Sequence, residues 1–335
     1  MGNDRADLVV WAVARRCIAV HPSTAVRRDL LKLDPEALVL DPPAGRPRAW
    51  MKLLRVHQWA KNTLVLVPLV TAQHFDLVSL SKVIGAFSAF SLAASATYIL
   101  NDLVDLDADR KHPSKRQRPL AAGTVPVFAA MFLALLLLVV ALGGALAIAP
   151  LFAAVLVGYL LLTTVYTFFL KRKMMVDIVV LASLYTIRVI GGAAAISVPV
   201  SEWLLIFSMF ICMSLALMKR YVELAARIDN DLPDPSNRNY RKSDLGIVAA
   251  LAAAAGFNAV TIFALYVSSD RVVLHEYRHP QALWLVCPIL IYWLSRTLLM
   301  AHRRQVDDDP IVFAMRDRNS LLAVAIIVVI LLAAM

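Results

Sequence analysis

Apolar residues fall into long uninterrupted stretches over most of this chain. From Trp59 onward nine such stretches follow one another, each near the length of a bilayer-spanning helix except the first, which is shorter. They cover residues 60–74, 82–101, 126–146, 149–170, 175–196, 203–221, 246–268, 281–300 and 318–335. The runs are continuous and lack the alternation of a transmembrane β-strand, so we predict an all-α integral membrane protein with nine transmembrane helices.

The first part of the chain has a different pattern. Residues 1–48 are polar and charged, and the segment is broken by Pro42, Pro43 and Pro47. Proline-rich polar sequence is typical of a linker. We therefore predict an N-terminal polar segment over 1–48 and a membrane domain over 49–335.

Composition agrees with a membrane protein and excludes several other classes. Of the 335 residues, 60% are hydrophobic and 17% are charged, against about 25% charged in a soluble domain. A soluble enzyme, a disordered chain and a disulfide scaffold are excluded. The three cysteines have no metal-ligand spacing, and we expect them to be small buried residues.

The positive charge lies on one side of the predicted helices. With 34 Lys and Arg against 24 Asp and Glu, the net charge is +10. The loops after the second, fourth, sixth and eighth stretches are basic, whereas those after the third and fifth contain no Lys or Arg. The positive-inside rule then predicts a cytoplasmic N-terminus and a C-terminus outside, in the cell (inner or plasma) membrane. A one-sided basic belt argues against nucleic acid as the main partner.

Acidic residues are concentrated where the second stretch ends. If the helix continues, Asp102, Asp105 and Asp109 share one face, at spacings i, i+3 and i+7. Carboxylates gathered in this way repel one another unless a cation lies between them, and Mg²⁺ binds to one or two carboxylates together with substrate phosphates. We predict a magnesium site here; the alternative is a solvated acidic run at the membrane edge.

Basic and polar residues near this cluster suit a substrate rich in phosphate, because Arg and Lys bind phosphate oxygens. After the cluster come Lys115, Arg116 and Arg118, and at the start of the first stretch stand Arg55, Lys61 and Asn62. For the latter group, interfacial anchoring is the alternative interpretation.

Charged residues also occur within or at the ends of the fifth and sixth stretches. In the fifth, Asp177 and Arg188 are about three turns apart, so both can face one cavity with Tyr185. An arginine at this depth is costly unless it is paired or hydrated, so function and a structural ion pair are both open. The sixth ends with Lys219, Arg220, Tyr221 and Glu223, and Glu223 can either bind metal or pair with a neighbouring arginine.

These residues resemble the UbiA superfamily of membrane transferases. The first motif of that superfamily, NDxxDxxxD, stands here as Asn101, Asp102, Asp105 and Asp109, and the sequence from Arg118 to Gly123 also matches. The resemblance implies a UbiA-type bundle of nine transmembrane helices, a cytoplasmic-side active site and Mg²⁺ held by the three catalytic aspartates.

Within the superfamily, the chain looks like the decaprenyl-phosphate phosphoribosyltransferase branch. The second aspartate motif of the prenyltransferases is replaced by KRYVEL at 219–224. The stretches RVHQWAKN (55–62), DRKHPSKRQRP (109–119) and YTIR (185–188) also resemble that branch. This implies that 5-phosphoribose passes from phosphoribosyl diphosphate to a polyprenyl phosphate, with the basic and polar residues named above binding substrate.

Two other functions stay open. The first is a UbiA-type prenyltransferase, which moves a polyprenyl group from its diphosphate to an aromatic or other acceptor; the missing second motif speaks against it. The second is a non-catalytic lipid-binding or transport protein, against which the acidic face and its basic neighbours speak.

The first 20 residues have a separate resemblance. Gly2, Asn3, Asp4 and Asp7 look like the last acidic motif of haloacid-dehalogenase-type phosphatases. The nucleophilic aspartate of such a domain would precede Met1. We therefore expect either an inactive remnant or a piece of a longer protein; an unrelated polar tail is the alternative.

Overall fold

The structure is a computed structural model that describes residues 4–20, 22–40, 47–111, 115–235, 238–269, 277–306 and 310–335. Gly2, Asn3, Pro42, Pro43, His112 and Pro113, which the sequence analysis used, lie outside these residues. The chain divides into two compact units, one of Met1–Arg55 with Tyr98–Leu135 and one of Val56–Thr97 with Leu136–Met335. Each is described by itself.

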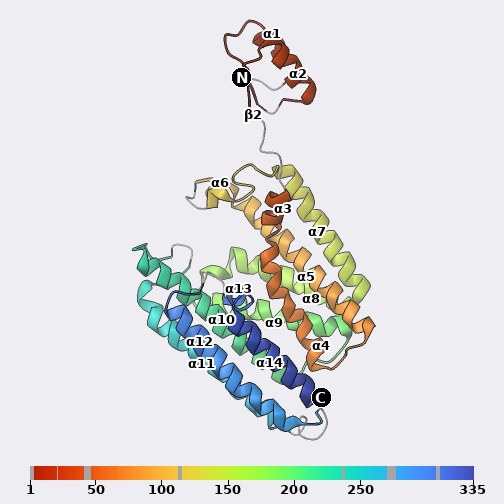
Figure 1. The fold of residues 1–335 in the computed structure, drawn as a ribbon, viewed down its shortest axis with the longest axis vertical. Coiled ribbons are helices and arrows are strands. Elements are labelled where there is room, and N and C mark those ends of the chain that lie inside the picture. The colour runs from red at the N-terminus through yellow and green to blue at the C-terminus, as the bar shows by residue number, and fades with distance from the viewer. Residues whose placement is uncertain are drawn as a thin grey trace. The chain divides into compact units, whose positions relative to one another are not determined.

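The first unit begins with a small α/β segment (Figure 1). Its elements are α1 (Asp7–Trp11), β1 (Ile18–Val20), α2 (Thr24–Leu33) and β2 (Leu38–Leu40). The strands pair in parallel, which requires a crossover, and α2 supplies it. Ser23 caps α2 by accepting a hydrogen bond from the Val26 backbone nitrogen. These two short strands depart from the all-α prediction.

The remainder of the first unit is helical. It contains α3 (Pro47–Leu54), the end of α5 (Leu77–Val104), α6 (Leu106–Lys111), the short 3₁₀ helix η2 (Lys115–Gln117) and the start of α7 (Val127–Ile148). The Lys52 ammonium donates a hydrogen bond to the Gln117 carbonyl at 3.3 Å, which joins α3 to η2. Segments that are distant in sequence therefore contact each other within this unit.

The second unit is a helical bundle. Besides the remaining parts of α5 and α7, it contains the 3₁₀ helix η1 (Val56–Leu66), α4 (Val67–Thr71), α8 (Pro150–Phe168), η3 (Leu170–Arg172), α9 (Val176–Ile196), α10 (Glu202–Asp229), η4 (Lys242–Asp244), α11 (Leu245–Val267), η6 (Pro280–Leu285), α12 (Val286–His302), α13 (Pro310–Ala314) and α14 (Arg318–Ala334).

Seven helical segments of the described chain are long and apolar enough to cross a bilayer. They are Leu77–Val104, Val127–Ile148, Pro150–Phe168, Val176–Ile196, Glu202–Asp229, Lys242–Val267 and Pro280–His302. Of the other two predicted spans, the first is the 3₁₀ helix η1 followed by the five residues of α4, and the last is α14, with 17 residues. The count of nine therefore stays a prediction.

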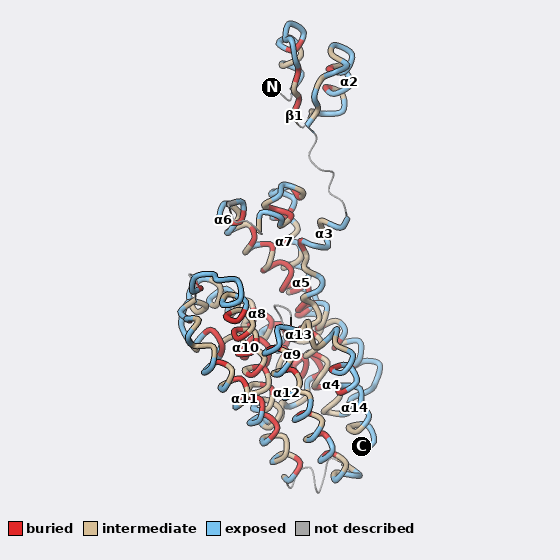
Figure 2. The backbone as a smooth tube through the Cα atoms, turned by 60° about the vertical axis from the view of Figure 1, so that its left-hand side comes forward, coloured by how far each residue is buried: buried red, intermediate tan, exposed pale blue. Residues whose placement is uncertain are grey.

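Burial differs sharply among these helices (Figure 2). In α9, 67% of the span is buried, and in α7 only 17%. The outward side of α7 carries large apolar side chains such as Phe128, Phe132 and Leu135, which are mostly exposed. A helix that is apolar all round and exposed is suited to lipid, whereas α9 is packed within the second unit.

Glycine allows α9 to approach its neighbours closely. A Cβ atom at Gly191 would lie 2.5 Å from the ring of Phe90 on α5, and one at Gly192 would overlap the Val65 carbonyl of η1. The close packing expected of glycine in a membrane helix is thus present here.

Candidate functional site

In the first unit, two aspartates of the predicted acidic cluster come together around an arginine. Asp102, in the last turn of α5, and Asp109, on α6, are 4% and 2% exposed. A single Arg118 nitrogen, Nη1, donates to Asp102 Oδ1 at 3.0 Å and to Asp109 Oδ2 at 2.7 Å. The sequence predicted that acidic and basic residues lie close together here. For Asp102, Asp109 and Arg118, the structure shows one guanidinium nitrogen between two carboxylates.

The third aspartate lies apart from this contact. Helix α5 ends at Val104 and α6 begins at Leu106, so Asp105 occupies a turn between them and is exposed. The prediction that all three carboxylates share one face assumed an unbroken helix, and the break changes the direction of Asp105. Asn101, on the last turn of α5, is half-buried.

Arg55 makes the second cationic contact to Asp102. Its Nη2 donates to Asp102 Oδ1 at 2.7 Å, and its guanidinium lies 4.8 Å from the centre of the Tyr98 ring. The backbone of Arg55 has a φ of 51°, a left-handed conformation that is unfavourable for a non-glycine residue. Arg55 and Arg118 remain 26% and 30% exposed, so solvent reaches both.

The other basic residues of the motif lie on η2. Arg116 is exposed and Lys115 is half-buried.

The donor set suits a hard cation that is shared with a substrate. No group of three or more His, Cys, Asp or Glu ready to hold a metal occurs in the described part of the chain. Mg²⁺ takes one or two carboxylates and fills its other positions with water and substrate phosphates. Asp102 and Asp109 supply such a pair of carboxylates.

In the second unit, a group of polar side chains surrounds Arg188. The Arg188 guanidinium donates to Asn62 Oδ1 at 2.7 Å, to the Tyr159 hydroxyl at 3.2 Å and to the Leu184 carbonyl. It also lies 4.9 Å from the Tyr159 ring centre and 5.6 Å from that of Tyr185. All of these partners, which belong to the described residues, are neutral.

Two further predicted residues belong to this group. Asn62 donates to the Ser91 hydroxyl at 3.0 Å, which fixes its amide so that the oxygen faces Arg188. The Lys61 ammonium lies 6.0 Å from the Tyr185 ring centre, and Lys61 is buried. The structure thus brings together Lys61, Asn62, Tyr185 and Arg188.

Asp177 belongs to a different polar group of the second unit from Arg188, although their spacing allowed both to face one cavity. Arg220 Nη2 donates to Asp177 Oδ2 at 2.8 Å, and the Tyr240 hydroxyl donates to Asp177 Oδ1 at 2.7 Å. Arg220 and Asp177 are both 0% exposed. Burial, and secondly the bond to Asp177, raise the pKa of Tyr240 above its usual value, so the hydroxyl keeps its proton.

Glu223 pairs with arginines, which is the second of the two interpretations that the sequence left open. Arg220 Nη1 donates to Glu223 Oε2, and Arg238 Nη1 donates to the same oxygen at 3.3 Å. The Nε atoms of Arg220 and Arg238 are buried without a partner among the described residues. Glu223 therefore serves as the acceptor for two cations in this structure.

The remaining predicted residues of α10 lie near α12. The Tyr221 hydroxyl is 3.0 Å from His302 Nδ1 and accepts a longer bond of 3.5 Å from Arg304, which is itself paired with Asp229 at 2.6 Å. Lys219 is half-buried.

Sequence reasoning missed Tyr240, Arg238, His302 and Arg304. Their partners are 15 to 83 residues away in the chain. The one signal available was a tyrosine and an arginine within the basic loop after the sixth stretch.

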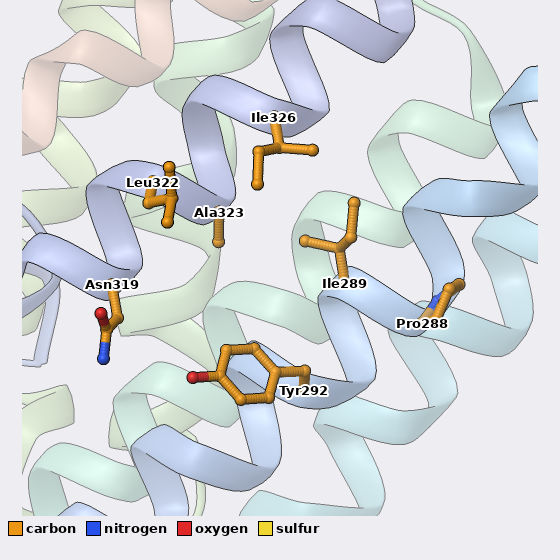
Figure 3. A pocket seen from close by; sticks show the side chains of 7 residues that line it. All are labelled: Pro288, Ile289, Tyr292, Asn319, Leu322, Ala323 and Ile326. Atoms are coloured by element: carbon orange, nitrogen blue, oxygen red, sulfur yellow. The ribbon is translucent and has the colours of Figure 1, made fainter.

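A groove of about 280 Å³ opens between α12 and α14 (Figure 3). Its lining consists of Pro288, Ile289, Tyr292, Asn319, Leu322, Ala323 and Ile326. The side chains are mostly apolar, and none of the predicted site residues is among them. The groove therefore belongs to the second unit and shares no residue with the polar groups described above.

Comparison with known proteins identifies the family. The family model described as the UbiA prenyltransferase family matches residues 63–316. An uncharacterized protein, y4nM, of Sinorhizobium fredii is 36% identical over 95% of this chain, and the match spans 62% of that protein's length. Nodulation protein NoeC of Azorhizobium caulinodans is 34% identical over 81% of this chain and 88% of its own length.

A third relative is the decaprenyl-phosphate phosphoribosyltransferase of Mycobacterium tuberculosis. It is 44% identical over 194 residues, which cover 56% of this chain and 64% of that protein. The chain thus spans less than two thirds of the length of this relative and of y4nM.

Solved structures agree in fold. A UbiA homolog from Archaeoglobus fulgidus, bound to GPP and Mg²⁺, superposes with a TM-score of 0.63 at 15% identity, over 85% of this chain and 99% of that one. The same homolog bound to DMAPP and Mg²⁺ gives a TM-score of 0.62. The family model, the shared fold and the seven apolar spans agree with the resemblance seen in the sequence: this multi-pass membrane protein belongs to the UbiA prenyltransferase family.

Proposed function

We propose that the chain transfers 5-phosphoribose from phosphoribosyl diphosphate to a polyprenyl phosphate and releases diphosphate. The observation that carries this proposal is the pair of buried carboxylates, Asp102 and Asp109, held by two partly exposed arginines. Such a group suits a diphosphate that arrives with a divalent cation. The similarity to the phosphoribosyltransferase of Mycobacterium tuberculosis supports the choice of the phosphoribosyl donor.

In this proposal, Asp102 and Asp109 hold Mg²⁺, with Asp105 retained from the motif as a third candidate ligand. When bound, the ion neutralises charge that develops on the leaving diphosphate. Arg55 and Arg118 act on the same charge, because guanidinium groups bind phosphate oxygens in a bidentate manner. Lys115 and Arg116 on η2 add positive charge, and Asn101 offers an amide beside Asp102.

The group around Arg188, in the second unit, suits an anionic or hydroxyl-bearing ligand. Arg188 is buried and donates to the neutral side chains of Asn62 and Tyr159, and an ionisable residue within a membrane span is by default a candidate functional residue. Lys61, Asn62 and Tyr185 contribute a second cation, an amide and an aromatic face.

The acceptor needs little activation. A lipid phosphate is already an anion, so its oxygen can attack the anomeric carbon as diphosphate leaves, without a strong general base. Glu223, in place of a second aspartate motif, is engaged by two arginines, which favours phosphoribosyl over prenyl transfer. Lys219, Arg220 and Tyr221 stay candidate substrate-binding residues around it.

We further propose that the active site faces the cytoplasm of a cell (inner or plasma) membrane, as the basic loops indicate. Residues 1–48 would then be a cytoplasmic segment distinct from the transferase domain, 49–335. Its own small core, which contains Trp11, Ala19 and Leu30, supports that separation.

The alternative is prenyl transfer from a polyprenyl diphosphate to an aromatic or other acceptor. The family description and the structural neighbours bound to GPP and DMAPP favour it. One experiment separates the two. Purified protein receives Mg²⁺ with either radiolabelled phosphoribosyl diphosphate and polyprenyl phosphate, or polyprenyl diphosphate and an aromatic acid, and lipids are then extracted.

Label in the lipid phase from the first mixture supports phosphoribosyl transfer. Product from the second mixture, with no label in lipid from the first, overturns it. Asp102→Ala protein, verified as folded by gel filtration, serves as the inactive control for both mixtures.

A further inference from the structure

Arg118 occupies an unusual position between two carboxylates. One nitrogen, Nη1, donates to Asp102 Oδ1 at 3.0 Å and to Asp109 Oδ2 at 2.7 Å, and both aspartates are buried. Of these two aspartates, Arg55 hydrogen-bonds to Asp102. Arg118 bridges both.

We propose that Arg118 occupies the position of the divalent cation between Asp102 and Asp109, and that it moves to substrate phosphate when the cation binds. This inference rests on the proposed function, in which these aspartates hold the metal. It makes Arg118 a positioning residue that couples cation binding to phosphate binding.

The two cations compete for the same pair of carboxylates. Arg118 Nη1 now contacts one oxygen of each, Asp102 Oδ1 and Asp109 Oδ2. A divalent cation held by these carboxylates would lie close to the guanidinium, and like charges repel each other. We therefore expect the guanidinium to leave when the cation binds.

The surroundings of Arg118 permit the side chain to leave while its backbone stays in place. Its backbone nitrogen donates to the Lys115 carbonyl at 2.9 Å, and its carbonyl accepts from the Ala122 nitrogen at 2.8 Å. The side chain is 30% exposed. A guanidinium released from the carboxylates is free to form bidentate bonds to phosphate.

The exchange also balances charge. Asp102 and Asp109 together carry two negative charges, and Arg55 and Arg118 carry two positive ones. A divalent cation alone adds unbalanced positive charge, and a phosphate alone adds negative charge. Each therefore binds better in the presence of the other, a reciprocal coupling.

The test measures Mn²⁺ affinity by electron paramagnetic resonance on the whole chain in detergent, without substrate. We expect Arg118→Gln to bind Mn²⁺ about tenfold more tightly than the parent, because an ionic hydrogen-bonded competitor is removed. Arg55→Gln also removes one positive charge beside Asp102, but it leaves the Arg118 bridge between the two aspartates in place. We therefore expect a clearly smaller change in Mn²⁺ affinity. Arg110→Gln, beside the exposed Asp107, should leave the affinity unchanged.

Equal affinities in Arg118→Gln and Arg55→Gln, or weaker binding in Arg118→Gln, would overturn the proposal. If Arg118→Gln folds poorly, its recovery is compared in Mn²⁺ and in Na⁺. Recovery with Mn²⁺ alone supports the exchange, since the ion then replaces the guanidinium; equally poor recovery in both overturns it. Tight Mn²⁺ binding by Arg118→Gln, with no phosphoribosyl transfer by the parent, would reject the proposed function and keep the exchange.

Discussion

Two ion-pair groups in this protein use the same residue types under opposite conditions. In the first unit, Arg55 and Arg118 reach buried aspartates but stay partly exposed themselves. In the second unit, Asp177 and Arg220 are both fully buried, and Tyr240 holds the remaining carboxylate oxygen. A pair with solvent access can exchange partners, whereas a sealed pair cannot do so without exposing a buried charge.

This difference in exposure indicates different roles for the two groups of ion pairs. The Asp102 group is suited to binding, because its cations can turn toward a ligand. The Asp177 group is suited to holding α9, α10 and the Tyr240 loop in a fixed arrangement, since Tyr240 also accepts from the Met175 backbone nitrogen at 2.9 Å. The predictions below test this division, beginning with the largest effect.

The sharpest test is Asp102→Asn. We expect a loss of about a thousandfold in kcat for transfer, since one partner of the cation and of two arginines is removed. Because both arginines have solvent access, the melting temperature in detergent should change little. A large fall in thermal stability with turnover retained would reverse the assignment of the two groups.

Asp177→Asn should give the opposite pattern. Removing this carboxylate charge leaves the buried Arg220 with Glu223 alone, at an expected cost of about 3 kcal/mol in the free energy of unfolding. Thermal unfolding monitored by circular dichroism in detergent measures it. The matched control is Asp229→Asn, which breaks the partly exposed pair with Arg304 and should change the stability far less, because solvent screens that pair.

We expect Tyr240→Phe to lower the free energy of unfolding by a smaller amount. The substitution removes one hydroxyl and keeps the ring, whose centre lies 5.3 Å from the Arg220 guanidinium. The loss of a hydrogen bond to a buried carboxylate should cost about 1.5–2 kcal/mol. The parent's KM for substrate should be preserved, and a selective rise in KM would instead place Tyr240 in the binding site.

The smallest effect concerns Asp317, which pairs with Arg296 at 2.6 Å and caps α14. The bond to Arg296 lowers the pKa of Asp317 below its ordinary value. Because the pKa of Asp317 is lower in the folded than in the unfolded state, the ion pair stabilises the folded protein at any pH above the unfolded-state pKa of about 3.9. This stabilisation is lost as the pH falls through the folded-state pKa.

Asp317→Asn keeps a capping side chain and loses the ion pair, so we expect a cost of under about 1 kcal/mol at pH 7. Melting curves of the variant and the parent should converge as the pH is lowered below 4. Curves that stay apart in acid would mean that the ion pair is not the source of the difference.

The helices were the most predictable part of the structure. Seven of the nine predicted stretches correspond to helices long enough to span a bilayer, because continuous apolar sequence leaves few alternatives. The first stretch was not recognisable as a 3₁₀ helix, since the apolar pattern of residues 60–66 says nothing of hydrogen-bond register. The strands at 18–20 and 38–40 were too short for any periodic signal.

The site was predictable in its residue types and less so in its geometry. The spacing of Asp102 and Asp109 placed both on one face, and they do meet at Arg118. The same argument failed for Asp105, because nothing in the spacing revealed the turn after Val104. Tyr240 was beyond reach, since its bond to Asp177 crosses 63 residues of chain.

The length of α10 has a consequence for the lipid that surrounds it. At 1.5 Å per residue, its 28 residues rise about 42 Å, which exceeds a hydrocarbon core of about 30 Å. A helix longer than the hydrocarbon core tilts or extends beyond it. Because the last three turns of α10 carry Lys219, Arg220 and Glu223, we expect this end of the helix to extend into the headgroup region.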